Sequence, residues 1–379
     1  MKELRIGDMQ VSVPIIQGGM GVAISLSGLA SAVANEGGIG VISAVGIGMK
    51  EPDYLKNFKK ANLRALRSEI QKARYLSDGI IGVNIMLAIS DFDDLLKAAI
   101  DQGIDIVFAG AGLPLRFPAG LSPEDIKKSH TKFVPKISSP KAAGLILKYW
   151  DSHYNLTPDA FALEGPLAGG HLGFKKEDIG SNEISLSSLV EQTVDVIKPY
   201  EEKYQEEIPV IAAGGIYSGK DIYSIMQHGA KAVKMGTRFV TTYECDASLE
   251  FKESYINSSK KDLTIIDSPV GLPGRAIRNI FIDEVNNGFK KPFKCYWKCL
   301  KTCDYQNVSY CIAQALFNAA RGNMSEGFAF AGAKAYMAER LQSVKETIDD
   351  LIAEYNLYEN MNSLSAQLPP RKLQINEQA

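Results

Sequence analysis

The chain has 379 residues, 45% of them hydrophobic and 23% charged, a composition typical of a protein with a large buried core. Its formal net charge of -2 gives no overall positive field for a phosphate backbone, so we do not expect nucleic acid as a partner. No stretch is apolar over the roughly 20 residues that a membrane span requires, and the N-terminus lacks a secretion signal, so we expect a cytoplasmic protein without a membrane partner.

Short apolar segments alternate with amphipathic ones from residue 13 onward. The expected strands are residues 13–16, 39–43, 82–86, 104–108, 133–137, 159–164, 209–213 and 231–235. Helices are expected at 25–37, 52–75, 91–103, 139–150, 185–204 and 218–229, several beginning with Ser or Asp and ending in Gly. Such alternation predicts parallel strands, and eight units match the length of a TIM (β/α)8 barrel; a doubly wound open sheet would show the same periodicity.

The unusual residues of the chain favour the barrel, because they follow the C-terminal ends of the expected strands. They include residues 17–20, Asn84, 165–171, 214–215 and 236–237. In a barrel these ends converge on one mouth, where the active sites of such proteins lie. We predict a barrel over residues 1–245 and a helical and loop extension over 246–379 that packs on it as a lid, with a long broken helix over 327–361.

Two glycine turns close the last expected strands, at Gly214–Gly215 and at Gly236–Thr237. Glycine lets backbone amides approach an anion, and the helix that begins after Ser218 would add partial positive charge, so these turns predict a phosphate site. The first expected strand runs into residues 17–20, where no Lys or Arg lies, so that turn suits a flat aromatic ring. Together the two ends would hold one mononucleotide cofactor.

The segments VPIIQGGMG, GVNIML, EGPLAGGHLGF, IPVIAAGGI and KMGTRF resemble, in order and spacing, the nitronate monooxygenase (2-nitropropane dioxygenase-like) family. That family and the similar flavin-dependent enoyl-ACP reductases are FMN-binding TIM barrels. The resemblance implies that the ring contacts are Gln17, Gly18, Gly19, Met20 and Asn84, that Lys141 lies near the ring, and that the phosphate is held by Gly214, Gly215, Gly236 and Thr237.

His171 stands in GPLAGGHLGF, directly after the sixth expected strand, which would place it at the barrel mouth. Imidazole can give or take a proton near neutral pH, and the resemblance implies that His171 is the catalytic residue beside the flavin. Gly169 and Gly170 would let the loop pass close to the flat cofactor. Glu164 could orient His171, whereas Arg275 and Arg278 are expected to serve packing or ion pairing.

The resemblance leaves more than one reaction open. One is oxidation of alkyl nitronates by O2 to a carbonyl compound and nitrite. Another is NAD(P)H-dependent reduction of an enoyl thioester with His171 supplying a proton, and a third possibility is a flavin-binding protein without turnover. In each case we expect FMN and a small-molecule ligand, and a homodimer is a reasonable expectation from base rates.

Four of the five cysteines lie in the segment 295–311, namely Cys295, Cys299, Cys303 and Cys311. If the first nine residues are helical, three thiols share one face. We expect these side chains to pack the extension on the barrel, because the usual CxxC ligand pair is absent; a bound metal or cluster and redox activity are the alternatives. No histidine or carboxylate pattern has metal spacing, so no catalytic metal is expected.

Overall fold

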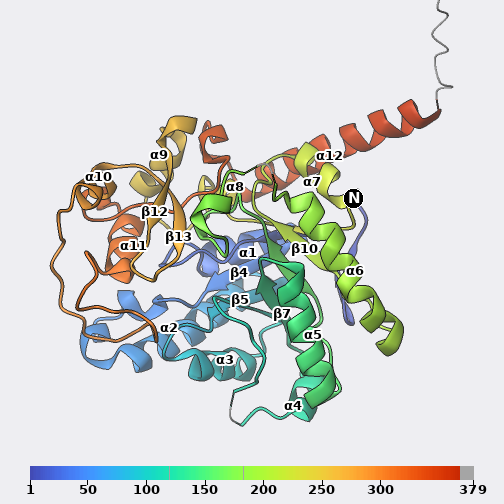
Figure 1. Ribbon diagram of the computed structural model, residues 1–379, viewed down its shortest axis with the longest axis horizontal. Helices are drawn as coiled ribbons and strands as arrows, with labels where there is room; N and C mark the ends of the chain where they lie inside the picture. Colours follow the sequence, from blue (N-terminus) through green and yellow to red (C-terminus); the bar gives the residue numbers. More distant parts are fainter. Residues whose placement is uncertain (119, 182, 368–379) are drawn as a thin grey trace, which may run out of the picture.

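Eight parallel strands form a closed barrel at the centre of the molecule (Figure 1). The computed structural model describes residues 1–118, 120–181 and 183–367. The barrel strands are β3 (Ile15–Gln17), β4 (Ile39–Ser43), β5 (Ile80–Met86), β6 (Ile106–Gly110), β7 (Lys132–Ile137), β8 (Phe161–Glu164), β10 (Val210–Ala213) and β11 (Ala232–Met235). The ring closes because β11 pairs with β3, with Val233 opposite Ile15. The TIM barrel prediction is confirmed, and the open sheet is wrong.

Helices cover the outside of the barrel (Figure 1). They are α1 (Ser27–Asn35), α2 (Tyr54–Leu76), α3 (Phe92–Asp101), α4 (Pro123–Lys128), α5 (Pro140–Tyr154), α6 (Leu186–Tyr204), α7 (Gly219–Met226) and α8 (Thr237–Val240). Ser139, Ser185 and Ser218 each cap a helix by accepting a hydrogen bond from the amide three residues later. These caps satisfy amides that have no partner within the helix, which is why Ser marks the starts of α5, α6 and α7.

The inside of the barrel is closed at the end where the strands begin. A hairpin of β1 (Leu4–Ile6) and β2 (Met9–Val11) buries its apolar side chains in one cluster with inward side chains such as Ile16, Phe108 and Ile211. Lys132, the first residue of β7, pairs with Asp8 of the hairpin turn at 2.6 Å. Because this plug fills one end, only the mouth at the C-terminal strand ends is left for a ligand.

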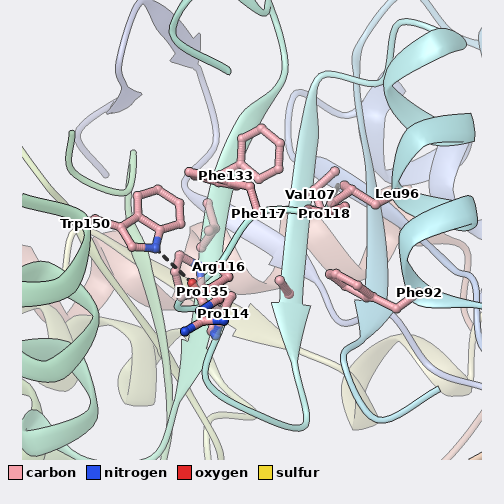
Figure 2. A pocket seen from close by; sticks show the side chains of 12 residues that line it. Phe92, Leu96, Val107, Pro114, Arg116, Phe117, Pro118, Phe133, Pro135 and Trp150 are labelled. Carbon is pink, nitrogen blue, oxygen red and sulfur yellow. Dashed lines mark hydrogen bonds between the residues drawn. The ribbon is translucent and has the colours of Figure 1, made fainter. Parts of the chain in front are cut away.

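A small cavity lies between the outer faces of β6 and β7 and the helices α3 and α5 (Figure 2). Its volume is about 20 Å³, room for about one water molecule, and its lining is mostly apolar. Trp150 closes it from α5 and donates a hydrogen bond from Nε1 to the carbonyl oxygen of Pro114 at 2.8 Å. The cavity is a feature of helix packing and lies away from the barrel mouth.

The extension after the barrel is only partly helical. It contains α9 (Leu249–Ile256), β12 (Leu263–Asp267), β13 (Pro273–Ile277), α10 (Ile280–Asn286), α11 (Ile312–Ala320) and α12 (Val344–Gln367). The two strands join β9 (Gly170–His171) in a three-stranded sheet, so the expectation of helix and loop alone is wrong.

The long helix expected over residues 327–361 begins only at Val344, and this part of the prediction is wrong. The preceding segment contains an extended stretch beside β13, where Phe330 forms an antiparallel bridge with Ala276. The division at residue 245 stays a prediction, and residues 368–379 lie outside the described part of the chain. Within that part, the structure contains no helix with the length and hydropathy of a membrane span.

Candidate active site

The ends of β3 and β11 meet at the barrel mouth and form the floor of the expected ring site. The amide of Gly18 donates to the carbonyl oxygen of Met235 at 2.9 Å. A Cβ added to Gly18 would lie 3.1 Å from the Cα of Gly236, and one added to Gly236 would lie 3.3 Å from the sulfur of Met20. The first and last turns of the barrel chain are thus in contact, as a cofactor held by both requires.

Asn84 lies on the other side of this turn. A Cβ added to Gly19 would lie 2.4 Å from the Cβ of Asn84, so only glycine fits between the two strand ends. Asn84 is 6% exposed, and its Oδ1 has no hydrogen-bond partner among the described residues. A buried acceptor without a donor destabilises the protein by about 1–3 kcal/mol, and a ring N–H would relieve that cost. The residues present therefore fit a flat heterocycle at this position.

The side chain of Gln17 has a different role from the expected contact with the ring. Its Oε1 accepts a hydrogen bond from the amide of Val41 at 2.9 Å, and its Nε2 donates to the carbonyl oxygen of Gly18. The side chain is fully buried between β3 and β4 and holds the turn in place. Contact with the ring therefore stays a prediction for its backbone. Lys141 is exposed in the first turn of α5, and its nearness to the ring also stays a prediction.

Both glycine turns of the expected phosphate site have left-handed or tightly packed backbones. Gly214 has φ +97° and Gly215 has φ +77°, and Cβ atoms added to them would lie 2.9 Å from atoms of Ala168 and Leu167. At the neighbouring strand end, Thr237 Oγ1 accepts from the amide of Gly332 at 2.9 Å. A side chain at either glycine would clash with residues 165–168, so contacts within the protein require these glycines, and phosphate binding here stays a prediction.

The N-terminus of α7 does not contribute as expected. The amide of Gly219 donates to Glu354 Oε2 at 2.7 Å, and Asp221 closes a capping box with Ser218. Two carboxylates already accept hydrogen bonds at the start of α7, so their negative charge disfavours a second anion there. The phosphate site is left to the glycine turns and to the start of α8, which corrects the expectation drawn from Ser218.

His171 lies on β9 opposite Gly274 of β13. Its Nε2 is 2.7 Å from the Oγ of Ser268, and its ring meets the ring of Phe330 edge-on at 4.9 Å between centroids. Burial lowers the pKa of His171 to about 4. The imidazole is therefore neutral at physiological pH, fixed in orientation, and able to accept a proton or to donate one hydrogen bond.

The glycines around His171 are explained by contacts within the protein. We name residues 165–173 the glycine loop. A Cβ on Gly169 would lie 2.6 Å from the carbonyl carbon of Ala331, and one on Gly173 would lie 2.4 Å from Ser138 Oγ. The bare backbone thus lets the loop pack between the extension and the β7 end. Close contact of Gly169 and Gly170 with the cofactor stays a prediction.

Arg275 of β13 anchors this loop from beneath. It is 7% exposed, and its Nη1 donates to the carbonyl oxygens of Pro166 at 2.8 Å and Ala168 at 2.6 Å. It was expected to serve packing or ion pairing, whereas its role is to tie two loop carbonyls to the sheet. Arg278, by contrast, is exposed and pairs with Asp283 at 2.6 Å, as expected.

Replacing Arg275 with methionine is expected to lower the free energy of unfolding by about 1–3 kcal/mol, because two carbonyls lose a buried charged donor. The loop should also lose its fixed position, so turnover per bound flavin should fall. Thermal unfolding and activity check both effects. Arg278→Met is the matched control. It should change the free energy of unfolding by less than about 0.5 kcal/mol and leave turnover per bound flavin unchanged. Equal effects of the two variants would contradict the anchoring role.

Three ionisable side chains lie together inside the mouth, and the sequence did not predict that they meet there. Lys136 of β7 pairs with Glu164 of β8 at 2.9 Å, and Lys234 of β11 lies over the ring of Phe108. Burial, followed by the charge of Lys136, lowers the pKa of Lys234 to about 7. Burial disfavours the charge on Glu164, but Lys136 and Lys234 outweigh it and lower the pKa of that carboxyl.

The three residues project inward because each shares strand parity with an inward apolar residue, namely Val134, Ala162 and Ala232. That alternation, read along each strand, would have identified them from the sequence. Glu164 therefore pairs with a lysine and does not orient His171, whose partner is Ser268.

Comparison with known proteins agrees with the resemblance seen in the sequence. The model of the family described as nitronate monooxygenase matches residues 2–354. A probable nitronate monooxygenase of Staphylococcus saprophyticus is 28% identical over 306 residues, which cover 74% of this chain and 79% of that protein. The structure of FabK from Thermotoga maritima superposes with a TM-score of 0.71 at 27% identity and covers 94% of this chain and 96% of its own.

A third relative, from Mycobacterium tuberculosis, is named (3aS,4S,5R,7aS)-5-hydroxy-7a-methyl-1-oxo-octahydro-1H-indene-4-carboxyl-CoA dehydrogenase. It is 25% identical over 275 residues, which cover 73% of this chain and 66% of the relative. The similar proteins therefore carry names for more than one reaction.

Proposed function

Because this chain belongs to the nitronate monooxygenase family, a family of flavin-dependent oxidoreductases, we propose that it binds FMN and oxidises alkyl nitronates with O2 to a carbonyl compound and nitrite. The glycine turns at Gly214 and Gly236 support FMN, since a bare backbone at these strand ends lets amides approach a phosphate. The unpaired Oδ1 of Asn84 supports a ring with an N–H group at the mouth. The observation that carries the reaction is the neutral, oriented His171.

His171 can act on either protonation state of the substrate. A nitronate anion would accept a hydrogen bond from the neutral imidazole, and a neutral nitroalkane would lose its α-proton to it. Ser268 fixes the ring while this happens, and Phe330 keeps water from one side of it. Lys136 is paired with Glu164, and burial lowers the pKa of Lys234 to about 7, so these side chains together add little net charge inside the mouth. Bound FMN would supply the redox chemistry, taking electrons from the substrate and passing them to O2.

A second candidate is reduction of an enoyl thioester with NAD(P)H. The likeness to FabK over 94% of the chain favours it, and so does the thioester substrate in the name of the mycobacterial relative. This reaction needs His171 to supply a proton. We place the nitronate reaction first because the matching family model and the staphylococcal relative both carry the name nitronate monooxygenase.

The experiment that separates the two uses the purified, FMN-loaded protein. O2 uptake is followed with propionate-3-nitronate, and NAD(P)H oxidation is followed with a short enoyl thioester. Uptake of O2 without NAD(P)H supports the first reaction. Thioester reduction without O2 uptake replaces it by the second, and a protein that fails to bind added FMN overturns both.

The pH dependence gives a further expected outcome. Because the pKa of His171 is lowered from 6.5 to about 4, the neutral form persists as the pH falls and is lost only near pH 4. With the nitronate, kcat/KM should therefore stay flat between about pH 5 and 8 and fall below that range. Steady-state rates over this range test it, with flavin fluorescence as the control for cofactor loss. A decline centred near pH 6.5 would show that the imidazole is not held neutral by burial.

A further inference from the structure

The segment 293–312 encloses a pocket of about 320 Å³, the larger of the two cavities described. Four thiols line it, those of Cys295, Cys299, Cys303 and Cys311. Residues 288–311 contain no helix, although the structure describes all of them. The thiols are therefore not spread along one helical face, and that expectation is wrong. The loop wraps them around a common space.

The size of the space decides what kind of cation fits. All five cysteines are free, so no disulfide fills the pocket. Among the described residues, no three His, Cys, Asp or Glu side chains form a ready site for a metal ion. The pocket that the four thiols line has a volume of about 320 Å³, which is more than the tetrahedral shell of one zinc occupies. A cluster of several irons bridged by sulfide carries its four cysteine ligands further apart and fills a wider space.

The other walls of the pocket suit a negatively charged cluster rich in sulfur. Lys294, Lys298 and Lys301 line it and supply positive charge. Trp297 stacks on Phe58 at 5.3 Å between ring centroids, and its buried Nε1 has no hydrogen-bond partner among the described residues. An unpaired N–H beside such a site can donate to a cluster sulfur, an interaction that tunes these centres.

The pocket is fixed to the mouth of the barrel. The amide of Ser90 donates to the carbonyl oxygen of Cys299 at 2.9 Å, and the amide of Lys301 donates to that of Ala88 at 2.9 Å. Residues 87–90 directly follow β5, the strand that carries Asn84. A group bound in the pocket would therefore be attached to a strand end of the candidate active site.

We infer that this pocket binds a four-iron, four-sulfide cluster through the thiolates of Cys295, Cys299, Cys303 and Cys311. Each thiol loses its proton to solvent as its sulfur bonds one iron. Loading a preformed cluster is thus an exchange of ligands and protons, without net oxidation or reduction. The inference goes beyond the proposed reaction and does not depend on it.

The test is made on the full chain, purified without O2 and incubated with equal amounts of ferrous and ferric iron and with sulfide, so that cluster assembly needs no further oxidant. About four irons and four sulfides per chain are expected, with visible absorbance that persists after the flavin is removed. Cys299→Ala should lose at least half of the iron. Cys245→Ala is the matched control, because Cys245 is also buried but contacts the carbonyl oxygen of Ile24 in the barrel. It should bind iron as the unmodified chain does.

Flavin content reports whether each variant has folded. If Cys299→Ala does not bind flavin, Cys303→Ala replaces it, because the side chain of Cys303 is only half-buried and its loss disturbs packing less. No iron after reconstitution, one zinc per chain, disulfides among the four residues by mass spectrometry, or full iron content in the folded variants would each overturn the inference.

Discussion

Replacement of His171 by asparagine should lower nitronate turnover by about 10² to 10⁴, the range for loss of a general acid-base group. Asparagine cannot take up a proton, and its shorter amide, which matches the position of Nδ1, does not reach Ser268, which is 2.7 Å from Nε2 in the protein. The glycine turns of the phosphate site are untouched, so FMN should stay bound. Turnover is measured per bound flavin, which separates a loss of chemistry from a loss of cofactor.

The control for this variant is His228→Asn. His228 follows α7 at the surface, where its Nδ1 is 2.7 Å from Glu191. Loss of that ion pair should change stability by less than about 1 kcal/mol and leave turnover as it is. Unchanged turnover in His171→Asn, or a fall that follows flavin loss alone, would remove His171 from the catalytic role.

Replacement of Gly214 by alanine should produce a chain that no longer retains FMN through purification. Gly214 has φ +97°, and the added Cβ would lie 2.9 Å from the amide nitrogen of Ala168 and 3.0 Å from the carbonyl oxygen of Gly165. Both neighbours are backbone atoms of the glycine loop, so the loop itself must move. Left-handed strain of about 1–2 kcal/mol adds to this clash, and we expect FMN affinity to fall by about a hundredfold.

Gly180→Ala is the control that separates the effect of backbone strain from the effect on the phosphate site. Gly180 has φ +104°, close to that of Gly214, but a Cβ there meets nothing within 4 Å. The control therefore carries the same backbone penalty without displacing the glycine loop. FMN titration by fluorescence compares the two, and circular dichroism confirms that both are folded. Similar affinities in the two variants would show that Gly214 is a turn residue only.

The sequence alone was sufficient to predict the barrel and most of its mouth. Each strand is short and apolar, and its end is marked by a glycine turn or a polar side chain such as Asn84. Since strand ends of a barrel converge, locating the strands also locates these residues relative to each other. The contact of Gly19 with Asn84 follows from that rule.

The remainder depends on contacts between segments far apart in the chain. β9 is only two residues long and exists because β13 pairs with it, so no local pattern indicates it. Ser268 and Phe330 reach His171 from the extension, where no periodicity points to the barrel mouth. The cysteine segment likewise follows the loop after β5 instead of its own helical propensity, because backbone bonds to residues 88–90 fix it.

The sheet of β9, β12 and β13 joins segments that are synthesised at different times. His171 and its partner Ser268 are 97 residues apart, so on the ribosome the histidine emerges long before the serine that orients it. The eight barrel strands end at Met235 and can pair first, whereas the sheet must wait for β13. His171 therefore cannot gain its contact with Ser268 or its pairing with β13 until these later segments have been synthesised.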